Sequence, residues 1–241
     1  MKNLVVLSGL IAATSTGCII SSSDSNAHVG ATWSLKSVVS NSEVGCPSGF
    51  DTAALYNQPV DASNQPVGNP IIDLFDCAAG AGRSAPLPPT AYETWIEITN
   101  HDNTAQYAQS VPAFVDVTDV DLTYNTDIYV DGGYFAFAWN LTGATSGQPL
   151  DCASAGVTGA SSGVEINATL SGTTAATNDQ FTCDDGSGIT AGIPQGSYTV
   201  SIDAFTSAGA VGTAPTLTNK TIGDANQVTN LGTINIPITG Q

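Results

Sequence analysis

CDDGSGITAGIPQGSYTVSIDAF, residues 183–205, is the stretch that decides the fold of this chain. It consists of a cysteine, a Gly-rich turn, an Ile-Pro-x-Gly turn and a segment in which apolar and polar residues alternate. CAAGAGRSAPLPPTAYETWIEIT, residues 77–99, has the same design 106 positions earlier. Alternation with a period of two is typical of a β-strand that buries one face. The stretch therefore predicts a β-protein in which one module occurs twice.

The offset of 106 positions extends over most of the chain. It relates Trp33 to Trp139 and Cys46 to Cys152. The other matched pairs are Leu35/Leu141, Val60/Ile166, Asp73/Asp179, Phe75/Phe181, Cys77/Cys183, Gly80/Gly186, Gly82/Gly188, Pro88/Pro194, Tyr92/Tyr198, Ile96/Ile202, Ile128/Ile234 and Val130/Ile236. A period near 100 residues indicates tandem domains rather than a solenoid. We predict a gapless repeat, with one module over residues 30–131, a second over 132–241, and Gly132-Gly133 at the joint.

Composition excludes several classes of partner. Lys and Arg total 4 against 21 Asp and Glu, for a formal net charge of −17. Such a chain is repelled by nucleic acids and by anionic lipid headgroups. Only 10% of residues are charged, so the surface depends on uncharged polar side chains. This pattern fits an extracellular protein better than a cytosolic enzyme.

The N-terminus has the features of a secretory signal over residues 1–17: Lys2, then an apolar run over 4–13 that is too short to span a membrane permanently. Thr14-Ser15-Thr16-Gly17-Cys18 resembles the bacterial lipoprotein cleavage box, although Ser15 stands where Leu is usual. The resemblance implies cleavage before Cys18 and a lipid (palmitate) on its thiol. Ile19, rather than Asp, implies sorting to the outer membrane. The alternative is ordinary signal cleavage, which would leave Cys18 as a free thiol.

A Ser-rich polar segment over residues 18–29 is predicted to be a flexible tether, in which His28 is exposed to solvent. With Cys18 lipidated, four cysteines remain, and four allow three pairings. The repeat favours Cys46–Cys77 and Cys152–Cys183 as disulfides within each module. Metal binding by these cysteines is disfavoured, because there is no Cys-x-x-Cys pair and neither histidine has a partner at ligand spacing.

Short segments rich in β-branched and aromatic residues, separated by Gly and Pro turns, predict an all-β sandwich, and no segment has helical periodicity over ten residues. The expected strands cover residues 31–38, a segment near Val60, 71–76, 92–99, 113–117, 127–131, 134–141, 164–170, 179–183, 197–205, 216–222 and 231–237.

Ile193-Pro194-x-Gly196-x-Tyr198-x-Val200 resembles the signature of prealbumin-like sandwiches, such as the regulatory domain attached to carboxypeptidases. Module one has Pro88 and Tyr92 but lacks the glycine. The wider pattern over residues 30–239 resembles repeat lipoproteins of myxobacterial type. The resemblance implies two tandem antiparallel β-sandwich domains, prealbumin- or Ig-like. It also implies a location at the cell surface and no catalytic activity.

The central strand of module one predicts a candidate binding face. Its alternation places Tyr92, Thr94, Ile96 and Ile98 inward, and it places Glu93, Trp95 and Glu97 outward. Trp95 corresponds to Ser201, and Tyr129, also expected outward, to Asn235. An exposed tryptophan flanked by acids suits sugar stacking or a protein hot spot. The alternative is that a loop or module two covers this face.

No catalytic residues are predicted. The chain has neither a Gly-x-Ser-x-Gly elbow nor a P-loop, and His101, beside Asp102, is the one histidine within the modules. Glu93 and Glu97 would be about 13 Å apart along a strand, beyond either glycosidase geometry. We expect a non-enzymatic protein.

The acidic residues raise the question of calcium binding, which the sequence does not favour. Acids cluster at Asp116, Asp119, Asp121, Asp127, Asp131, Asp184 and Asp185. They lack the Asp-x-Asp-x-Asp-Gly spacing of a calcium loop, and a solvated acidic surface explains them equally well. We therefore predict no metal or cofactor.

The sequence as a whole predicts a lipid-anchored cell-surface protein that acts as a binding or structural display module. Its expected partners are the membrane, through the N-terminal lipid, and a protein or polysaccharide. The alternative function is a carbohydrate-binding or calcium-dependent accessory module of a surface enzyme system.

Overall fold

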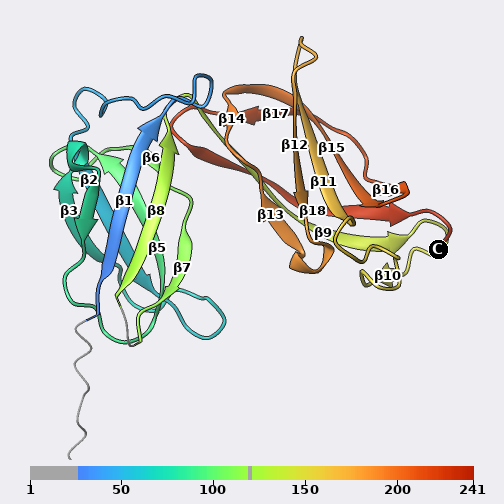
Figure 1. Cartoon of the computed structure of the whole chain (residues 1–241), viewed down its shortest axis with the longest axis horizontal. Coiled ribbons are helices and arrows are strands. Elements are labelled where there is room, and N and C mark those ends of the chain that lie inside the picture. Colours follow the sequence, from blue (N-terminus) through green and yellow to red (C-terminus); the bar gives the residue numbers. More distant parts are fainter. Residues whose placement is uncertain (1–26, 119–120) are drawn as a thin grey trace, which may run out of the picture.

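The computed structural model describes residues 27–118 and 121–241. The predicted signal peptide, Cys18, most of the predicted tether and Asp119 lie outside the described residues. The described chain is all-β, with strands β1–β18 and two short 3₁₀ turns, Cys77–Ala79 and Cys183–Asp185 (Figure 1). Within these ranges, no helix is long and apolar enough to cross a membrane.

Strands β1–β8 form two facing sheets in the N-terminal half (Figure 1). One sheet has the order β4-β1-β8, and the other has the order β3-β2-β5-β6, with β7 also paired to β5. Their bounds are β1 Val29–Lys36, β2 Thr52–Pro59, β3 Ile71–Asp76, β4 Ala81–Arg83, β5 Ala91–Thr99, β6 Gln106–Gln109, β7 Ala113–Asp116 and β8 Leu122–Tyr129.

Strands β9–β18 repeat these strand pairings in the C-terminal half, but there a β16–β18 bridge joins them into one continuous ten-stranded sheet. β13 and β9 pair as β4 and β1 do, and β12-β11-β15 pair as β3-β2-β5 do. The bounds are β9 Gly132–Gly143, β10 Pro149–Leu150, β11 Gly163–Leu170, β12 Ala176–Phe181, β13 Ser187–Ile189, β14 Ile193–Pro194, β15 Gly196–Thr206, β16 Gly209–Thr213, β17 Leu217–Ile222 and β18 Gln227–Ile238. The expected β-sandwich fold is confirmed. One refinement is that the first and last long strands of each half, β1/β8 and β9/β18, run parallel.

Each half has its own hydrophobic cluster, so inward-facing side chains are buried mainly against their own repeat copy. A tryptophan links the first long strand of each half to a cysteine turn. Trp33 Nε1 donates to the Cys77 carbonyl oxygen at 2.9 Å, and Trp139 Nε1 donates to that of Cys183 at 3.1 Å. The same cysteines form the disulfides Cys46–Cys77 and Cys152–Cys183, which confirms the predicted pairing.

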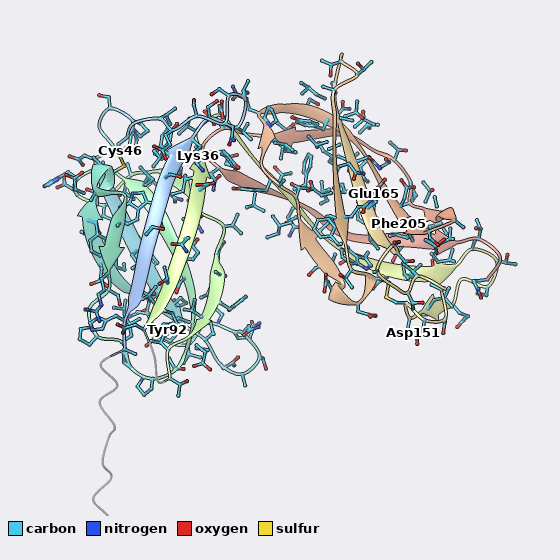
Figure 2. The ribbon with its side chains drawn as sticks, viewed as in Figure 1. Lys36, Cys46, Tyr92, Asp151, Glu165 and Phe205 are labelled. Atoms are coloured by element: carbon cyan, nitrogen blue, oxygen red, sulfur yellow. A yellow bond between two sulfur atoms is a disulfide. The ribbon has the colours of Figure 1, made fainter. Side chains whose placement is uncertain are left out.

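A tyrosine fixes the start of the central strand at the other end. In the first half, Cys46 and Tyr92 lie at opposite ends of the sandwich (Figure 2). The Tyr92 hydroxyl donates to the Pro88 carbonyl at 2.8 Å, and that of Tyr198 donates to the Pro194 carbonyl at 2.7 Å. Both copies therefore keep the tyrosine bond, although the first lacks the glycine of the Ile-Pro-x-Gly turn.

The repeat is not gapless, contrary to our expectation. Ile166 pairs with Ile202, whereas in the first half it is Leu55, not Val60, that pairs with Ile96. The segment between the first cysteine and the next strand is shorter in the first half, residues 47–51 against 153–162, and the following loop is longer, 60–70 against 171–175. The two differences, five and six residues, cancel to within one residue in the sequence offset, so the strands keep their places. Loop lengths can change in this way at little cost in stability.

The last strand also departs from the constant offset. Ile128 lies beside Leu35, and Ile236 lies beside Leu141, so Ile236 rather than Ile234 is the counterpart of Ile128. An irregularity between Asn230 and Thr233 in β18 contributes one residue of this two-residue shift. The other is already present at Asn230, which pairs with Ala136 as Thr123 pairs with Gly30. The structural counterpart of Tyr129 is consequently Pro237, not Asn235.

Shorter departures occur at the edges of the sheets. The fold begins before residue 30, because Ala27 and Val29 are already buried. The strands that the sequence did not predict, β4, β6, β10, β13, β14 and β16, have between two and five residues. Such short edge segments carry too few alternations to be recognised by periodicity.

The joint between the halves is closely bonded. Asn226, 2% exposed, accepts from the Tyr129 amide at 2.7 Å and donates to the Gln109 carbonyl at 2.7 Å. Its own amide donates to the Gly132 carbonyl at 2.9 Å. A Cβ at Gly132 would collide with the Ile193 carbonyl, so this position needs glycine for close approach. The C-terminal half is therefore bound directly to the last strand of the first half.

Asp131 secures the other side of the joint. Its carboxylate accepts from the Ser37 hydroxyl and from the Val38 amide, both at 2.6 Å. Burial opposes ionisation of this group, but the hydrogen bonds hold the pKa of Asp131 below its usual value. The carboxylate is thus a structural acceptor at the joint.

We predict that replacing both Cys152 and Cys183 by alanine lowers the free energy of unfolding by about 3–4 kcal/mol, because the disulfide closes a loop of 31 positions in the unfolded chain. Urea denaturation measures the loss. Dithiothreitol should destabilise the wild type to at least the same degree. An unchanged denaturation midpoint in the variant would contradict the prediction.

We predict that Asn226→Ala lowers the free energy of unfolding by about 2–4 kcal/mol, because it leaves buried backbone groups unpaired. Asn219→Ala is the matched control. Asn219 also has a left-handed backbone, with φ 54° against 61° for Asn226, but it is exposed and has no bonds at the joint. Small-angle scattering should show a larger radius of gyration for Asn226→Ala alone. Equal losses in the two variants would mean that backbone strain, and not the joint, is responsible.

Candidate functional site

The candidate site is the outer face of the sheet β3-β2-β5-β7. Burial along β5 confirms the predicted alternation: Tyr92, Thr94, Ile96 and Ile98 are buried, whereas Glu93, Trp95 and Glu97 are half-buried. We name as the apolar face the outward side chains Tyr56, Ile72, Leu74, Trp95 and Phe114. Of these, only Trp95 is predicted from the sequence.

Cross-strand pairing shows that the apolar face extends over β3, β2, β5 and β7. Tyr56 in β2 lies between Ile72 in β3 and Trp95 in β5. Opposed residues in an antiparallel pair share one face of the sheet. Phe114 is 56% exposed, Leu74 52% and Ile72 43%. Large apolar side chains grouped in this way indicate an interaction surface, whereas scattered ones do not.

Trp95 is stacked rather than free. Its ring lies 4.9 Å from that of Tyr56 with an interplanar angle of 8°, and its Nε1 donates to Glu97 Oε1 at 2.9 Å. The Tyr56 hydroxyl oxygen accepts from Asn103 Nδ2 at 3.2 Å, and burial raises the pKa of this hydroxyl. One face of the indole is therefore covered, and the cover is Tyr56 from the adjacent strand, a residue that our alternatives had not considered.

Two acids lie among these side chains. Glu93 lies opposite Phe114 on β7. Glu97 lies opposite Ala54, which in turn faces Leu74. The candidate site thus combines an apolar surface with carboxylates, in keeping with the predicted positions of Glu93 and Glu97.

The C-terminal half has polar residues at the positions equivalent to Tyr56, Ile72 and Trp95. Asn167 lies between Asn178 and Ser201, as Tyr56 lies between Ile72 and Trp95. Asn178 Nδ2 donates to Asn167 Oδ1 at 2.9 Å. The fold therefore does not require apolar residues on this face.

Glu165 is at the centre of this polar face. It accepts from Asn167 Nδ2 at 2.7 Å and from Gln180 Nε2 at 2.8 Å. Partial burial works against the ionised form, but these hydrogen bonds keep the pKa of Glu165 below its usual value. The side chains of the second face thus satisfy one another, unlike the exposed apolar groups of the first.

Tyr129 is not part of the apolar face. It lies at the joint, where its amide donates to Asn226 and its ring is 5.8 Å from that of Tyr134. A Cβ on Gly192 would collide with the Tyr129 ring. Tyr129 does not share a face with Trp95, because β8 and β5 belong to different sheets. The C-terminal half packs against its ring, in agreement with the alternative that module two covers this residue.

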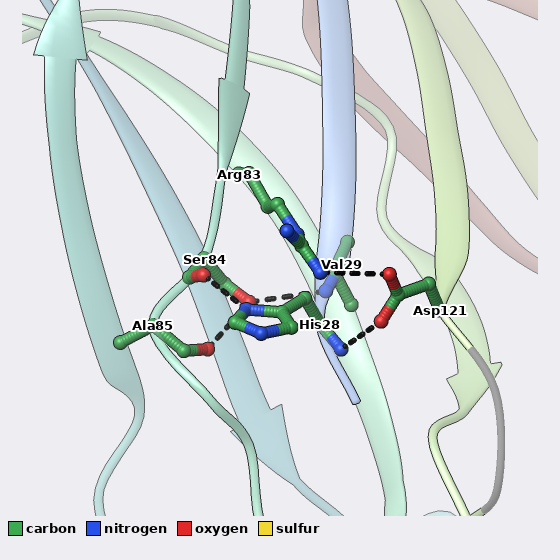
Figure 3. Close-up of polar contacts among 6 residues, drawn as sticks. All are labelled: His28, Val29, Arg83, Ser84, Ala85 and Asp121. Atoms are coloured by element: carbon green, nitrogen blue, oxygen red, sulfur yellow. Dashed lines mark hydrogen bonds and ion pairs between the residues drawn. The ribbon is translucent and has the colours of Figure 1, made fainter. Parts of the chain in front are cut away.

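His28 is held in place where the chain enters β1, contrary to the expectation of a free tether residue (Figure 3). Its amide donates to Asp121 Oδ1 at 2.9 Å, and its Nδ1 lies 2.7 Å from the Ser84 carbonyl oxygen. Arg83 binds the other Asp121 oxygen at 2.8 Å. These contacts anchor the start of the fold.

The predicted acidic residues lie in separate interactions. Asp127 accepts from Lys36 Nζ at 2.8 Å, and Asp121 binds Arg83. Across residues 27–118 and 121–241, no three histidine, cysteine or acidic side chains converge on one point. His101 Nδ1 lies 3.9 Å from Asp51 Oδ2, and both side chains are on the surface. The described residues therefore offer neither a metal cluster nor a buried acid–base pair.

No protein-family model matches the sequence, and no curated protein is similar to it. A leucine-rich repeat protein from Bacteroides thetaiotaomicron is 13% identical, with a TM-score of 0.37 over 88% of this chain and 26% of that protein. A minor pilin of Streptococcus agalactiae is 11% identical, with a TM-score of 0.31 over 89% and 98%. A candidate adhesin from Bacteroides ovatus is 10% identical, with a TM-score of 0.30 over 86% and 87%.

This chain spans about a quarter of the leucine-rich repeat protein. Structural likeness at these TM-scores carries no argument about function. The resemblance to myxobacterial-type lipoproteins stays a prediction.

We predict that acrylamide quenches the fluorescence of Trp95 selectively, because Trp33 and Trp139 are only 5% and 6% exposed. Trp95→Phe should remove the accessible component, and Tyr56→Asn should increase quenching by uncovering the indole. Stern–Volmer titration of the purified protein measures both effects. Unchanged quenching in Trp95→Phe would mean that the tryptophan on this face is shielded.

Proposed function

We propose that this protein is a non-enzymatic binding module of the cell surface and that the apolar face is its recognition surface. One observation carries the proposal: two copies of the same scaffold differ at equivalent outward positions, where the first has tyrosine, isoleucine and tryptophan and the second has asparagine, asparagine and serine. Exposed apolar groups that the fold does not need are a cost in solubility, and a binding role accounts for their presence.

We further propose the chain organisation that brings this face to the surface. The signal peptide over residues 1–17 directs export, Cys18 carries the lipid at the outer membrane, and residues 18–29 link the lipid to two modules, 30–131 and 132–241. Separate hydrophobic clusters and separate disulfides in the two halves support the division into modules. Disulfides also fit an oxidising compartment outside the cytosol.

The test is adhesion of beads coated with the purified protein to intact cells of the organism that produces it. The triple variant Tyr56→Asn/Ile72→Asn/Trp95→Ser transfers the polar residues of the second half to the first without changing the net charge. We expect it to reduce bead retention by about tenfold or more, as loss of a central aromatic contact does at protein interfaces.

The matched control is Asn167→Thr/Asn178→Thr/Ser201→Thr, which changes the equivalent positions of the second half. It should retain the beads as the wild type does. Both variants should keep the near-ultraviolet circular dichroism of Trp33 and Trp139, which shows that the sandwich is intact. Equal retention by the apolar-face variant and the wild type, or no retention by either, would refute the proposed role of this face.

A further inference from the structure

The apolar face is shaped for side chains rather than for a flat ring. Tyr56 and Trp95 stack with their rings nearly parallel, so each covers one ring face of the other. A sugar ring binds an aromatic residue by lying flat on an open ring face. Ile72, Leu74 and Phe114 are the more exposed members of this face, and they suit aliphatic and aromatic groups. This composition favours contact with apolar amino-acid side chains.

Charge limits the identity of the partner further. Glu93 and Glu97 flank the stacked pair, and none of the residues paired across this face is basic. Lys36 and Arg83, two of the chain's four basic residues, form ion pairs on the opposite sheet. A second copy of this chain would bring another net charge of −17 to the same surface. Like charges oppose such self-association, whereas a basic partner is attracted and steered.

We propose that the apolar face binds a polypeptide segment of another protein in which apolar side chains are flanked by lysine or arginine. The apolar groups would cover Ile72, Leu74 and Phe114, and the basic groups would pair with Glu93 and Glu97. This inference rests on the proposed function and specifies the chemistry of the ligand for the same face.

The test uses two synthetic octapeptides and a neutral glucan hexasaccharide, titrated into the purified protein by calorimetry. One peptide alternates leucine or phenylalanine with lysine, and the other has glutamate in place of lysine. We expect the basic peptide to bind the wild type at least about tenfold more tightly than the acidic peptide does. Its affinity should fall by about tenfold in the variant Tyr56→Asn/Ile72→Asn/Trp95→Ser. Raising the salt concentration should weaken the binding.

A pair of charge variants separates the local acids from the overall charge. Glu93→Gln/Glu97→Gln should lower the affinity for the basic peptide by about threefold or more. Glutamine at position 97 keeps a hydrogen-bond acceptor for the Trp95 indole. Glu165→Gln/Asp203→Asn is the matched control, because it removes the same charge from the equivalent face of the second half. The control should bind the peptide as the wild type does.

Two results would overturn the inference. If the basic peptide binds the apolar-face variant as tightly as the wild type, or does not bind the wild type, the face does not recognise such a segment. If the hexasaccharide binds the wild type and not the apolar-face variant, the ligand is a glycan. In the second case bead retention would still depend on the face, so the proposed function would stand while the inference about its partner failed.

Discussion

The hydrogen bond from a tryptophan indole to a cysteine carbonyl is the interaction on which each half of the structure depends. Trp33 in β1 reaches the Cys77 carbonyl, and Trp139 in β9 reaches that of Cys183. In each half the bond runs from the first long strand, β1 or β9, to the turn that follows β3 or β12. The disulfide at the same cysteine fixes that turn to the preceding loop. Sheet separation and loop position are thereby set at one point, and the indole donor is satisfied inside the core.

This internal bracing leaves the outer faces free to diverge. The buried side chains of β5 and β15 alternate in the same way, and a tyrosine bond begins both strands. Since the core supplies the stability, the outward residues are constrained only by solubility and by contacts with partners. One face has become a network of amide and carboxylate side chains around Glu165, and the other an apolar surface around Tyr56 and Trp95. The two halves can therefore be compared directly, because equivalent faces of the same scaffold differ in their exposed apolar groups.

Contacts at the joint define how the two halves are oriented relative to each other. Asn226 satisfies a donor on Tyr129 and an acceptor on Gln109, both in the first half, and Asp131 binds the segment after β1. Buried polar groups at an interface tolerate few alternatives, because a shifted orientation would leave them unpaired. The apolar face therefore has a set orientation relative to the C-terminal half.

The sequence by itself determined the β-class, the repeat, both disulfides and the inward and outward residues of β5, because a period of two and paired cysteines are local or repeated signals. It did not determine the register of β2 and β18 relative to the repeat. Compensating loop lengths hide the change at β2, and a two-residue shift in β18 leaves the alternation of inward and outward residues unchanged. It also could not reveal that Tyr56, Ile72, Leu74 and Phe114 join Trp95, or that Tyr129 is covered. Cross-strand pairing between segments distant in the sequence creates those contacts, and only the tertiary structure decided them.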